Sequence, residues 1–111
     1  MLPTTMHICV SENRVSDEIA VKLLILSLAE HEPTAVIHLF INELSADFTA
    51  WVRNRLNVVL ENVAFEQNVG WNIKPSLLTL LVERGIASVV WIDSDVIITS
   101  SISRFFDSLP L

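Results

Sequence analysis

Glycine is scarce in this chain of 111 residues, which contains only Gly70 and Gly85. Phosphate-binding loops of the G-x-G-x-x-G and P-loop types need several glycines, because the backbone must approach the phosphate closely. The nucleophile elbow G-x-S-x-G and the zinc-binding pattern H-E-x-x-H are also missing from the sequence. The sequence therefore excludes these four motifs as the basis of any function.

Cysteine is scarcer still, since Cys9 is the single one in the chain. One cysteine cannot form an internal disulfide or a cysteine-rich zinc site. Cys9 stands in the apolar run HICV, residues 7–10. We therefore expect a small buried side chain here and not a reactive thiol.

Basic residues are few as well, with seven Lys and Arg against 13 Asp and Glu, a net charge of −6 and a pI near 4.8. Affinity for nucleic acids and for anionic membrane surfaces comes largely from Lys and Arg, so neither is an expected partner. The longest apolar run, residues 19–29, contains Lys22 and is far shorter than the about 20 apolar residues of a membrane span. The N-terminus lacks the charged and apolar regions of a signal peptide. We therefore expect a cytoplasmic protein without a membrane span.

Predicted strands and helices alternate along the chain. Apolar runs predict strands at residues 6–13, 34–42, 57–65 and 88–99, with helices at 16–31, 45–56 and 74–85 between them. We expect helix N-caps at Ser16 and Ser45, a helix start at Pro75 and a helix end at Gly85. This alternation is typical of right-handed crossovers. The sequence thus predicts one α/β domain over residues 1–111, a three-layer α/β/α arrangement with a mainly parallel sheet.

Two aspartates interrupt the last predicted strand, SVVWIDSDVIIT, residues 88–99. In a strand, Asp93 and Asp95 would point to the same face, where two carboxylates about 4 Å apart repel by about 4 kcal/mol. A divalent cation would remove this repulsion, and Mg²⁺ or Mn²⁺ commonly binds one or two carboxylates together with substrate phosphates. The alternative is that the pair simply marks a strand that ends in water. A ligand is the stronger hypothesis where the pair follows the carboxyl end of a parallel strand.

The surrounding segment, WNIKPSLLTLLVERGIASVVWIDSDVIIT, resembles the D-x-D region of GT-A fold nucleotide-diphospho-sugar glycosyltransferases, above all the glycogenin-like enzymes. The shared features are a Lys-Pro helix start, a leucine-rich helix, a glycine and an apolar strand that ends in D-x-D. The segment ICVSENRVSDEIAVKLLILSLAEHEP is also similar to the first strand and helix of such proteins. The resemblance implies an enzyme that binds a nucleotide-diphospho-sugar, with a UDP-sugar favoured, through Mn²⁺ or Mg²⁺. Such an enzyme transfers the sugar to an acceptor, which the sequence does not identify.

The resemblance also implies roles for the residues of the D-x-D motif. Asp93 would contact the metal or the ribose of the donor, and Asp95 would be a metal ligand. Ser94, which lies between them, would contact the nucleotide.

Three further residues are assigned to the donor site by the same resemblance. Lys74 matches a basic residue near the donor phosphates, where the positive end of a helix dipole also favours an anion. Ser11 and Asn13 belong to a polar turn that meets the base and the ribose. An ordinary surface lysine and ordinary turn residues are the alternative interpretation of these three positions.

The chain departs from the family beyond the D-x-D motif. Such transferases continue into an acceptor-binding half that supplies another metal ligand, often a histidine, whereas here 16 residues follow Asp95 and none is histidine. We therefore expect a donor-binding part that is incomplete at its C-terminus. One alternative is a nucleotide- or metal-binding domain without catalysis. Another is a haloacid-dehalogenase-like phosphatase, whose first aspartate attacks phosphate, but that motif belongs on a first strand and needs a later lysine, and no lysine follows Lys74.

Overall fold

The computed structural model describes residues 5–61 and 73–108. Along the chain, the strands are β1 (His7–Glu12), β2 (Val36–Ile41), β3 (Val58–Glu61) and β4 (Val89–Trp91). The helices are the short 3₁₀ helix η1 (Val15–Asp17), α1 (Glu18–His31), α2 (Ala46–Arg53), α3 (Ile73–Glu83) and α4 (Ile102–Asp107). This alternation of strands and helices confirms the predicted α/β class.

The four strands form one parallel sheet in the order β3-β2-β1-β4. His7 of β1 is in register with Val36 of β2 on one side and with Val89 of β4 on the other. β1 is therefore an inner strand, flanked by the next strand of the chain and by the last one. The parallel arrangement agrees with the prediction from the alternating pattern.

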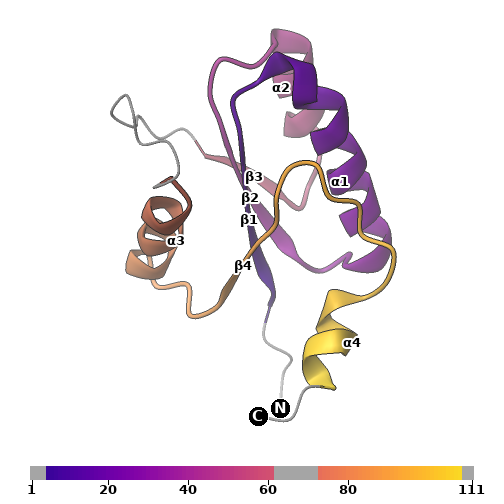
Figure 1. The fold of residues 1–111 in the computed structure, drawn as a ribbon, viewed down its shortest axis with the longest axis vertical. Coiled ribbons are helices and arrows are strands. Elements are labelled where there is room, and N and C mark those ends of the chain that lie inside the picture. The colour runs from indigo at the N-terminus through magenta and orange to yellow at the C-terminus, as the bar shows by residue number, and fades with distance from the viewer. Residues whose placement is uncertain (1–4, 62–72, 109–111) are drawn as a thin grey trace.

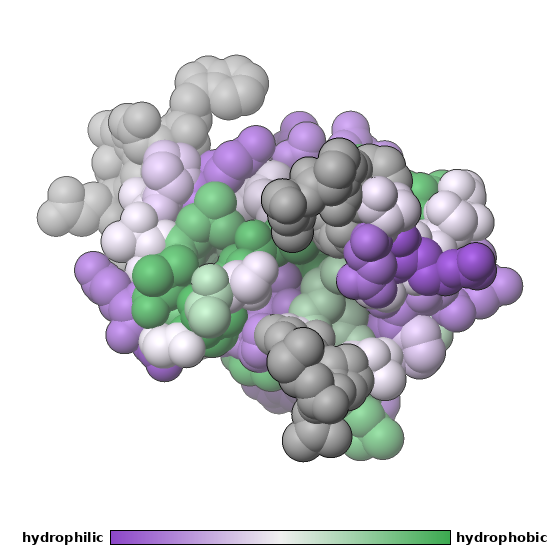
Figure 2. All heavy atoms as spheres, turned by 90° about the horizontal axis from the view of Figure 1, so that it is seen from below, coloured by the Kyte–Doolittle hydropathy of each residue, from purple (hydrophilic) through white to green (hydrophobic). Residues whose placement is uncertain are grey.

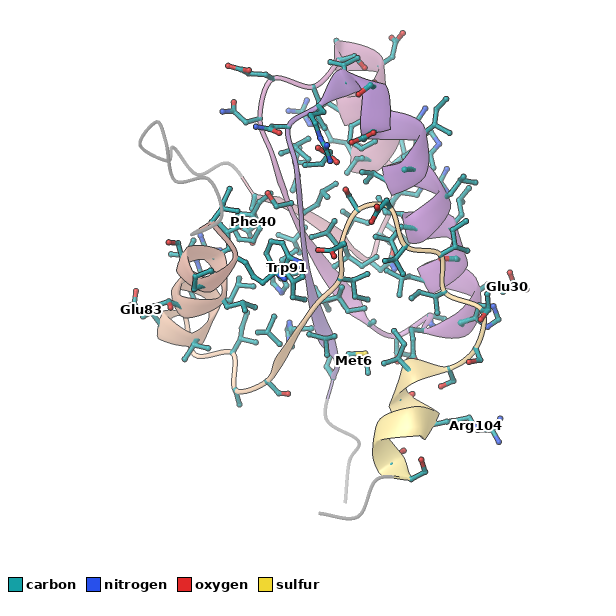
Figure 3. The ribbon with its side chains drawn as sticks, viewed as in Figure 1. Met6, Glu30, Phe40, Glu83, Trp91 and Arg104 are labelled. Atoms are coloured by element: carbon teal, nitrogen blue, oxygen red, sulfur yellow. The ribbon has the colours of Figure 1, made fainter. Side chains whose placement is uncertain are left out.

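Helices cover both faces of the sheet, with α1 and α2 on one face and α3 on the other (Figure 1). Successive strand side chains point to opposite faces, so Ile8 and Val10 of β1 pack in the larger core cluster with α1, while Cys9 packs with Leu77 and Leu81 of α3. Phe40 and Trp91 point from the sheet toward α3 (Figure 3). The result is the predicted three-layer arrangement, and Cys9 is buried as expected.

The helix ends agree with the sequence at two positions. Ser45 caps α2, because its side chain accepts a hydrogen bond from the backbone N–H of Phe48 at 3.2 Å and donates one to Glu18 Oε1 at 2.8 Å. Gly85 follows α3 with a φ of +93°, a left-handed conformation that glycine adopts without strain. Both predictions, the cap at Ser45 and the helix end at Gly85, are confirmed.

Two predicted helix starts are wrong. Ser16 lies inside η1, and α1 begins at Glu18 after Asp17, whose side chain makes no capping hydrogen bond. Pro75 is the third residue of α3, not the first. It is still tolerated there, because the N–H groups of a first helical turn have no partner within the helix.

The last strand is much shorter than predicted, because β4 spans residues 89–91 and not 88–99. Past Ile92 the chain turns, with the N–H of Val96 donating to the carbonyl oxygen of Asp93 at 3.2 Å. The following segment crosses to the α1 side, where the N–H of Ile98 donates to Ser27 Oγ at 3.0 Å and Ile98 packs against the larger core cluster. Of the apolar residues after the two aspartates, Ile98 therefore packs against the core and not in the sheet, whereas Val96 and Ile97 are exposed.

The amino ends and the carboxyl ends of the strands lie on opposite sides of the molecule. Figure 2 looks at the amino ends of the strands, where apolar side chains gather on the α3 side of the molecule. At the opposite side, here called the carboxyl edge, lie the carboxyl ends of the strands, where the chain leaves β1 at Glu12 and β4 at Trp91.

Among the residues described, no helix is both long and apolar enough to cross a membrane.

Candidate functional site

The sheet has a topological switch point between β1 and β4. β1 continues into α1 on one face, whereas β4 is reached from α3 on the opposite face (Figure 1). In open parallel sheets, ligands bind at such a point, outside the carboxyl ends of the strands. The end of β1 with the residues that follow it, 11–14, and the D-S-D sequence after β4 meet at this place.

Asp93, Ser94 and Asp95 form a tight turn and not a strand. The hydrogen bond from Val96 N–H to Asp93 C=O closes the turn, so Asp93 occupies the first turn position, where aspartate is favoured for structural reasons alone. Asp93 and Asp95 are exposed, while Ser94 is only 8% exposed. The expectation of two carboxylates on one face of a strand is therefore wrong, but both acids do project into solvent beyond the end of β4.

Ser94 is tied to the end of β1. Its hydroxyl donates to Glu12 Oε1 at 2.6 Å, across 82 positions of the chain. Glu12 is the last residue of β1 and is 4% exposed. This hydrogen bond fixes the D-S-D turn against the neighbouring strand.

Glu12 is surrounded by hydrogen-bond donors. Its Oε2 accepts from the backbone N–H groups of Asn13 and Arg14 at 3.0 and 3.1 Å and from Arg14 Nε at 3.0 Å. Burial alone would raise the pKa of this carboxyl group, but the hydrogen bonds of Arg14, Ser94 and Asn13 outweigh burial and lower the pKa to about 2. Glu12 is therefore ionised at neutral pH although it is buried.

Arg14 is the cation nearest to this cluster of carboxylates. Besides Glu12, its guanidinium contacts Asp17 Oδ2 at 2.7 Å, and its side chain is 67% exposed. The pKa of Arg14 is raised by its hydrogen bond and charge interaction with Glu12, and also by the charges of Asp17 and Asp95. Arg14 thus supplies positive charge beside the D-S-D turn.

Lys74 and Asp93 are brought together through one tryptophan. Lys74 Nζ lies 5.3 Å from the ring centroid of Trp91, a cation–π contact, and Trp91 Nε1 donates to Asp93 Oδ1 at 2.8 Å. Lys74 is the second residue of α3, so its charge adds to the positive end of the helix dipole. The lysine and the first aspartate of the predicted site therefore share a contact residue.

Ser11 and Asn13 both lie near the carboxyl end of β1, but they differ in secondary structure and in exposure. Ser11 belongs to β1, in register with Phe40 of β2, and is half-buried. The expectation of a turn residue is wrong for Ser11. Asn13 does follow the strand, with an exposed side chain, and only its backbone N–H is bonded to Glu12. Asn13 is thus the more accessible of the two to a ligand.

The two exposed carboxylates suit a hard divalent cation in chemical type. Within residues 5–61 and 73–108, no group of three or more His, Cys, Asp or Glu side chains is placed to hold a metal ion. Mg²⁺ and Mn²⁺ are often bound by one or two carboxylates, with water and substrate phosphates as the other ligands. Asp93 and Asp95 fit that incomplete kind of donor set, and Arg14 and Lys74 lie near it as possible phosphate partners.

A second polar network runs across the α3 face of the sheet. His7 Nδ1 and His38 Nε2 are 2.9 Å apart, and His38 Nδ1 is 3.1 Å from Glu61 Oε1. Arg84 NH1 donates to Glu61 Oε2 at 2.7 Å. His38 is thus a hydrogen-bonded residue of β2.

Burial, hydrogen bonds and neighbouring charges together shift the pKa values of His7, Glu61 and Cys9. Burial, and after it the charge of His38, lowers the pKa of His7. Burial raises the pKa of Glu61, but the hydrogen bonds and charges of Arg84 and His38 outweigh it, and the pKa falls below its usual value. Burial, with the charge of Glu61, raises the pKa of the neighbouring Cys9 thiol to about 12, so this thiol is not a nucleophile at neutral pH.

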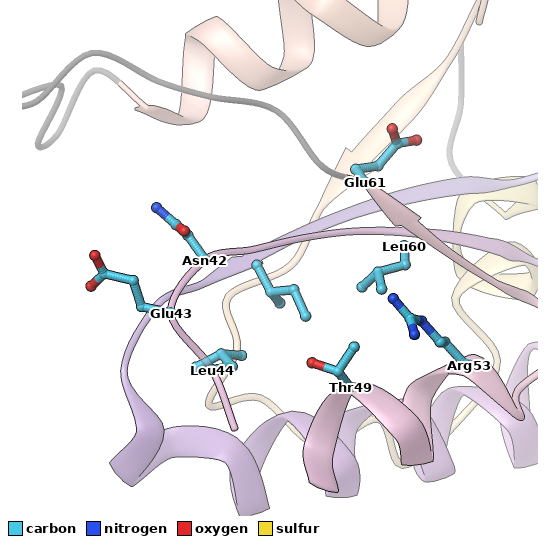
Figure 4. A pocket seen from close by; sticks show the side chains of 8 residues that line it. Asn42, Glu43, Leu44, Thr49, Arg53, Leu60 and Glu61 are labelled. Atoms are coloured by element: carbon cyan, nitrogen blue, oxygen red, sulfur yellow. The ribbon is translucent and has the colours of Figure 1, made fainter. Parts of the chain in front are cut away.

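A pocket of about 460 Å³ opens at the same carboxyl edge, between β2, β3 and α2 (Figure 4). Its apolar floor comes from Ile41, Leu44 and Leu60, and the Arg53 side chain points toward the hollow. Sequence reasoning assigned no site residue here. In the strand order, β1 separates this pocket from β4 and the D-S-D turn that follows it.

Sequence reasoning missed the central place of Glu12 and the part of Arg14. The signal available was a charged residue at the end of an otherwise apolar strand, in the run SENR. Such a residue needs a partner when it is buried. Its partner Ser94 is too far along the chain for any local pattern to identify it.

No protein-family model matches this chain, and the search of curated proteins gave no match either. The function proposed next therefore rests on the residues at the switch point and on the resemblance of the D-S-D segment.

Proposed function

We propose that this chain is the donor-binding part of a glycosyltransferase and that it binds a nucleotide-diphospho-sugar through a divalent cation. The observation that carries the proposal is the position of the D-S-D turn. Its two exposed carboxylates lie at the carboxyl end of β4, beside the end of β1, at the switch point of the sheet. The motif resemblance and this position support the same kind of ligand.

Each predicted residue has a physical role in this proposal. Asp95 and Asp93 would hold Mn²⁺ or Mg²⁺, which would neutralise the diphosphate and take up charge on the departing nucleotide. Lys74, at the start of α3, attracts the phosphates by its own charge and by the helix dipole. Asn13 and Ser11 lie at the end of β1, on the side where the base and ribose would enter.

The experiment is a calorimetric titration of UDP and of GDP, with and without Mn²⁺, into the wild type and Asp95→Asn. We expect UDP binding that depends on Mn²⁺ and that Asp95→Asn weakens by at least about tenfold, as is usual when a metal site loses a supporting group. Asp47→Asn is the matched control, because Asp47 is an exposed aspartate of α2 and belongs neither to the D-S-D turn nor to the end of β1. Mn²⁺-independent binding, or equal losses in both variants, would contradict the proposal.

A binding domain without sugar transfer is the second candidate. It is favoured by the donor set, since the described residues offer two exposed carboxylates at the turn and no group of three metal-binding side chains. The two candidates differ in whether the bound UDP-sugar is cleaved: a transferase releases UDP from it, and a binding domain does not. Release of free UDP from a UDP-sugar in the presence of Mn²⁺, lost in Asp95→Asn, supports the transferase, whereas binding without release supports the binding domain.

A further inference from the structure

Glu12 connects two segments that the proposed site needs. Its Oε2 closes the segment after β1, through the N–H groups of Asn13 and Arg14 and the Nε of Arg14. Its Oε1 accepts from Ser94 Oγ of the neighbouring turn at 2.6 Å and also from Arg14 Nη2 at 3.3 Å. One buried carboxylate thus joins the end of β1, the nearest arginine and the D-S-D turn.

The hydrogen bond to Ser94 determines how the turn is oriented. Ser94 is 8% exposed, while the residues on both sides of it, Asp93 and Asp95, are exposed. The buried Ser94 hydroxyl therefore ties the turn to the end of β1, while the two carboxylates stay at the surface. The inward position of Ser94 depends on a buried acceptor, and Glu12 is the acceptor that the structure gives it.

Glu12 also affects the proposed site through its ion pair with Arg14. The guanidinium is held between Glu12 and Asp17 and lies in the field of Asp95. Without the Glu12 carboxylate, the guanidinium would keep its contact with Asp17 but lose the one that holds it at the end of β1, and it could then move toward Asp95. Glu12 therefore keeps the turn in place and also keeps the nearest positive charge occupied.

We propose that Glu12 is a positioning residue that holds the D-S-D turn, through Ser94, in the orientation that binds the divalent cation. This inference rests on the proposed function, since it concerns the same cation site. It concerns the middle residue of the motif, whose hydroxyl donates to Glu12.

The test replaces Ser94 and leaves Glu12 intact, because a change at Glu12 would also remove the hydrogen bonds of Asn13 and Arg14. Ser94→Ala removes the hydroxyl, Ser94→Thr keeps it, and Ser100→Ala is a matched control at an exposed serine. Free Mn²⁺ is measured by electron paramagnetic resonance. We expect about tenfold weaker Mn²⁺ binding in Ser94→Ala and near wild-type binding in Ser94→Thr and Ser100→Ala.

The Trp91 indole provides a local reporter, because its N–H donates to Asp93 Oδ1. In the wild type, Mn²⁺ should broaden the indole N–H resonance of Trp91, identified by its loss in Trp91→Phe. At the same Mn²⁺ concentration, Ser94→Ala should show less broadening, and Ser94→Thr should restore it. Thermal unfolding of each variant confirms that folded proteins are being compared.

The two proposals fail in different ways. If the wild type binds no Mn²⁺, the proposed function fails, and hydrogen exchange of the Asp95 and Val96 amides still decides the role of Glu12. Faster exchange in Ser94→Ala than in Ser100→Ala supports the anchoring of the turn by Glu12, and equal exchange overturns it. If the wild type binds Mn²⁺ and Ser94→Ala binds it equally well, the positioning role is overturned while the proposed function stands.

Discussion

Glu12 and Glu61 form two polar networks of similar construction in different parts of the sheet. Each is the last residue of a strand, β1 or β3, and each is almost fully buried, at 4% and 8% exposure. Each accepts from one arginine, Arg14 or Arg84, and from one further polar side chain. In each, hydrogen bonds hold the pKa of the carboxyl group below its usual value despite burial.

The partners differ in where they lie. Glu61 is bonded to His38 on β2 and is reached by Arg84 from the end of α3, so its contacts join neighbouring layers of the fold. Glu12 is bonded to Arg14 and Ser94, which lie in the segments that follow β1 and β4 at the carboxyl edge. The same chemical arrangement therefore joins fixed elements in one region and holds loop segments in the other. If the proposed function holds, position relative to the switch point, and not the residue types, separates the structural role of Glu61 from the functional role of Glu12.

The Glu61 network also has a defined proton arrangement. A carboxylate only accepts hydrogen bonds, so His38 donates to it through Nδ1–H. A neutral His38 then accepts at Nε2, and His7 must be the donor through Nδ1–H at 2.9 Å. The pKa of His7 in this pair is lowered first by burial and then by the charge of His38. The Glu12 network contains no histidine.

The largest effect should come from Glu61→Ala. His38, which is 6% exposed, would lose its acceptor inside the protein, whereas Arg84 could turn to water because its side chain is 42% exposed. We expect the free energy of unfolding in urea to fall by about 2–3 kcal/mol, the cost of leaving a buried donor unpaired. Glu83→Ala, at an exposed glutamate of α3, should change it by less than about 0.5 kcal/mol. Equal losses in the two variants would contradict a structural role for Glu61.

A smaller effect with a defined pH dependence is expected for Glu12→Gln. The pKa of Glu12 is lowered to about 2 in the folded protein from an ordinary value of 4.5, so its carboxylate stabilises the fold above pH about 4.5. That contribution is lost as the pH falls from about 4.5 toward 2. We expect Glu12→Gln to destabilise the protein by about 1–2 kcal/mol at pH 7, since a charged hydrogen-bond acceptor is replaced by a neutral one.

The measurement for Glu12 is urea unfolding of both proteins at several pH values between 7 and about 2.5. The difference between wild type and Glu12→Gln should shrink as the pH falls through this range. Asp47→Asn serves as a control for the loss of one carboxylate at the surface. A difference that stays constant with pH would mean that the charge of Glu12 is not what stabilises the end of β1.

The sequence predicted the four strands, the helices α1, α2 and α3, the parallel sheet and the end of the sheet where the D-S-D turn lies, but not η1 or α4. These follow from local patterns and from the rule that connects parallel strands, which needs no contact between distant residues. The length of β4 could not be predicted in this way. Val96, Ile97 and Ile98 continue an apolar run, and periodicity cannot tell a strand from a segment that packs on a helix, as Ile98 does against the α1 side.

The partners of the buried glutamates were equally out of reach of the sequence. Glu12 and Ser94 are 82 residues apart, and His38 and Glu61 are 23 apart. Either glutamate could have been an exposed strand end, as the alternative interpretation of Asp93 and Asp95 proposes. Only the three-dimensional arrangement shows which acids are engaged by donors inside the protein and which remain accessible to a ligand.

The smallest change in stability is expected for two lysines that each contact a tryptophan. Comparing them tests whether the region of the D-S-D turn differs in function from the rest of the molecule. Lys74 Nζ lies 5.3 Å from the ring centroid of Trp91 at the carboxyl edge, and Lys22 Nζ lies 5.4 Å from that of Trp51. Each exposed cation–π contact contributes about 0.5–1 kcal/mol at most, so Lys74→Gln and Lys22→Gln should destabilise the protein by similar, small amounts.

Their effects on ligand binding should differ if the edge is the donor site. Lys74 precedes the second turn of α3 and lies beside Trp91, the contact residue of Asp93. Lys74→Gln should weaken Mn²⁺-dependent UDP binding about fivefold, or roughly 1 kcal/mol, the value of one hydrogen bond to a phosphate. Lys22→Gln should leave it unchanged, because α1 carries Lys22 away from the D-S-D turn. Equal binding by both variants would show that the lysine beside the D-S-D turn contributes only its contact with tryptophan, and the role of Lys74 would then be structural, like that of Lys22.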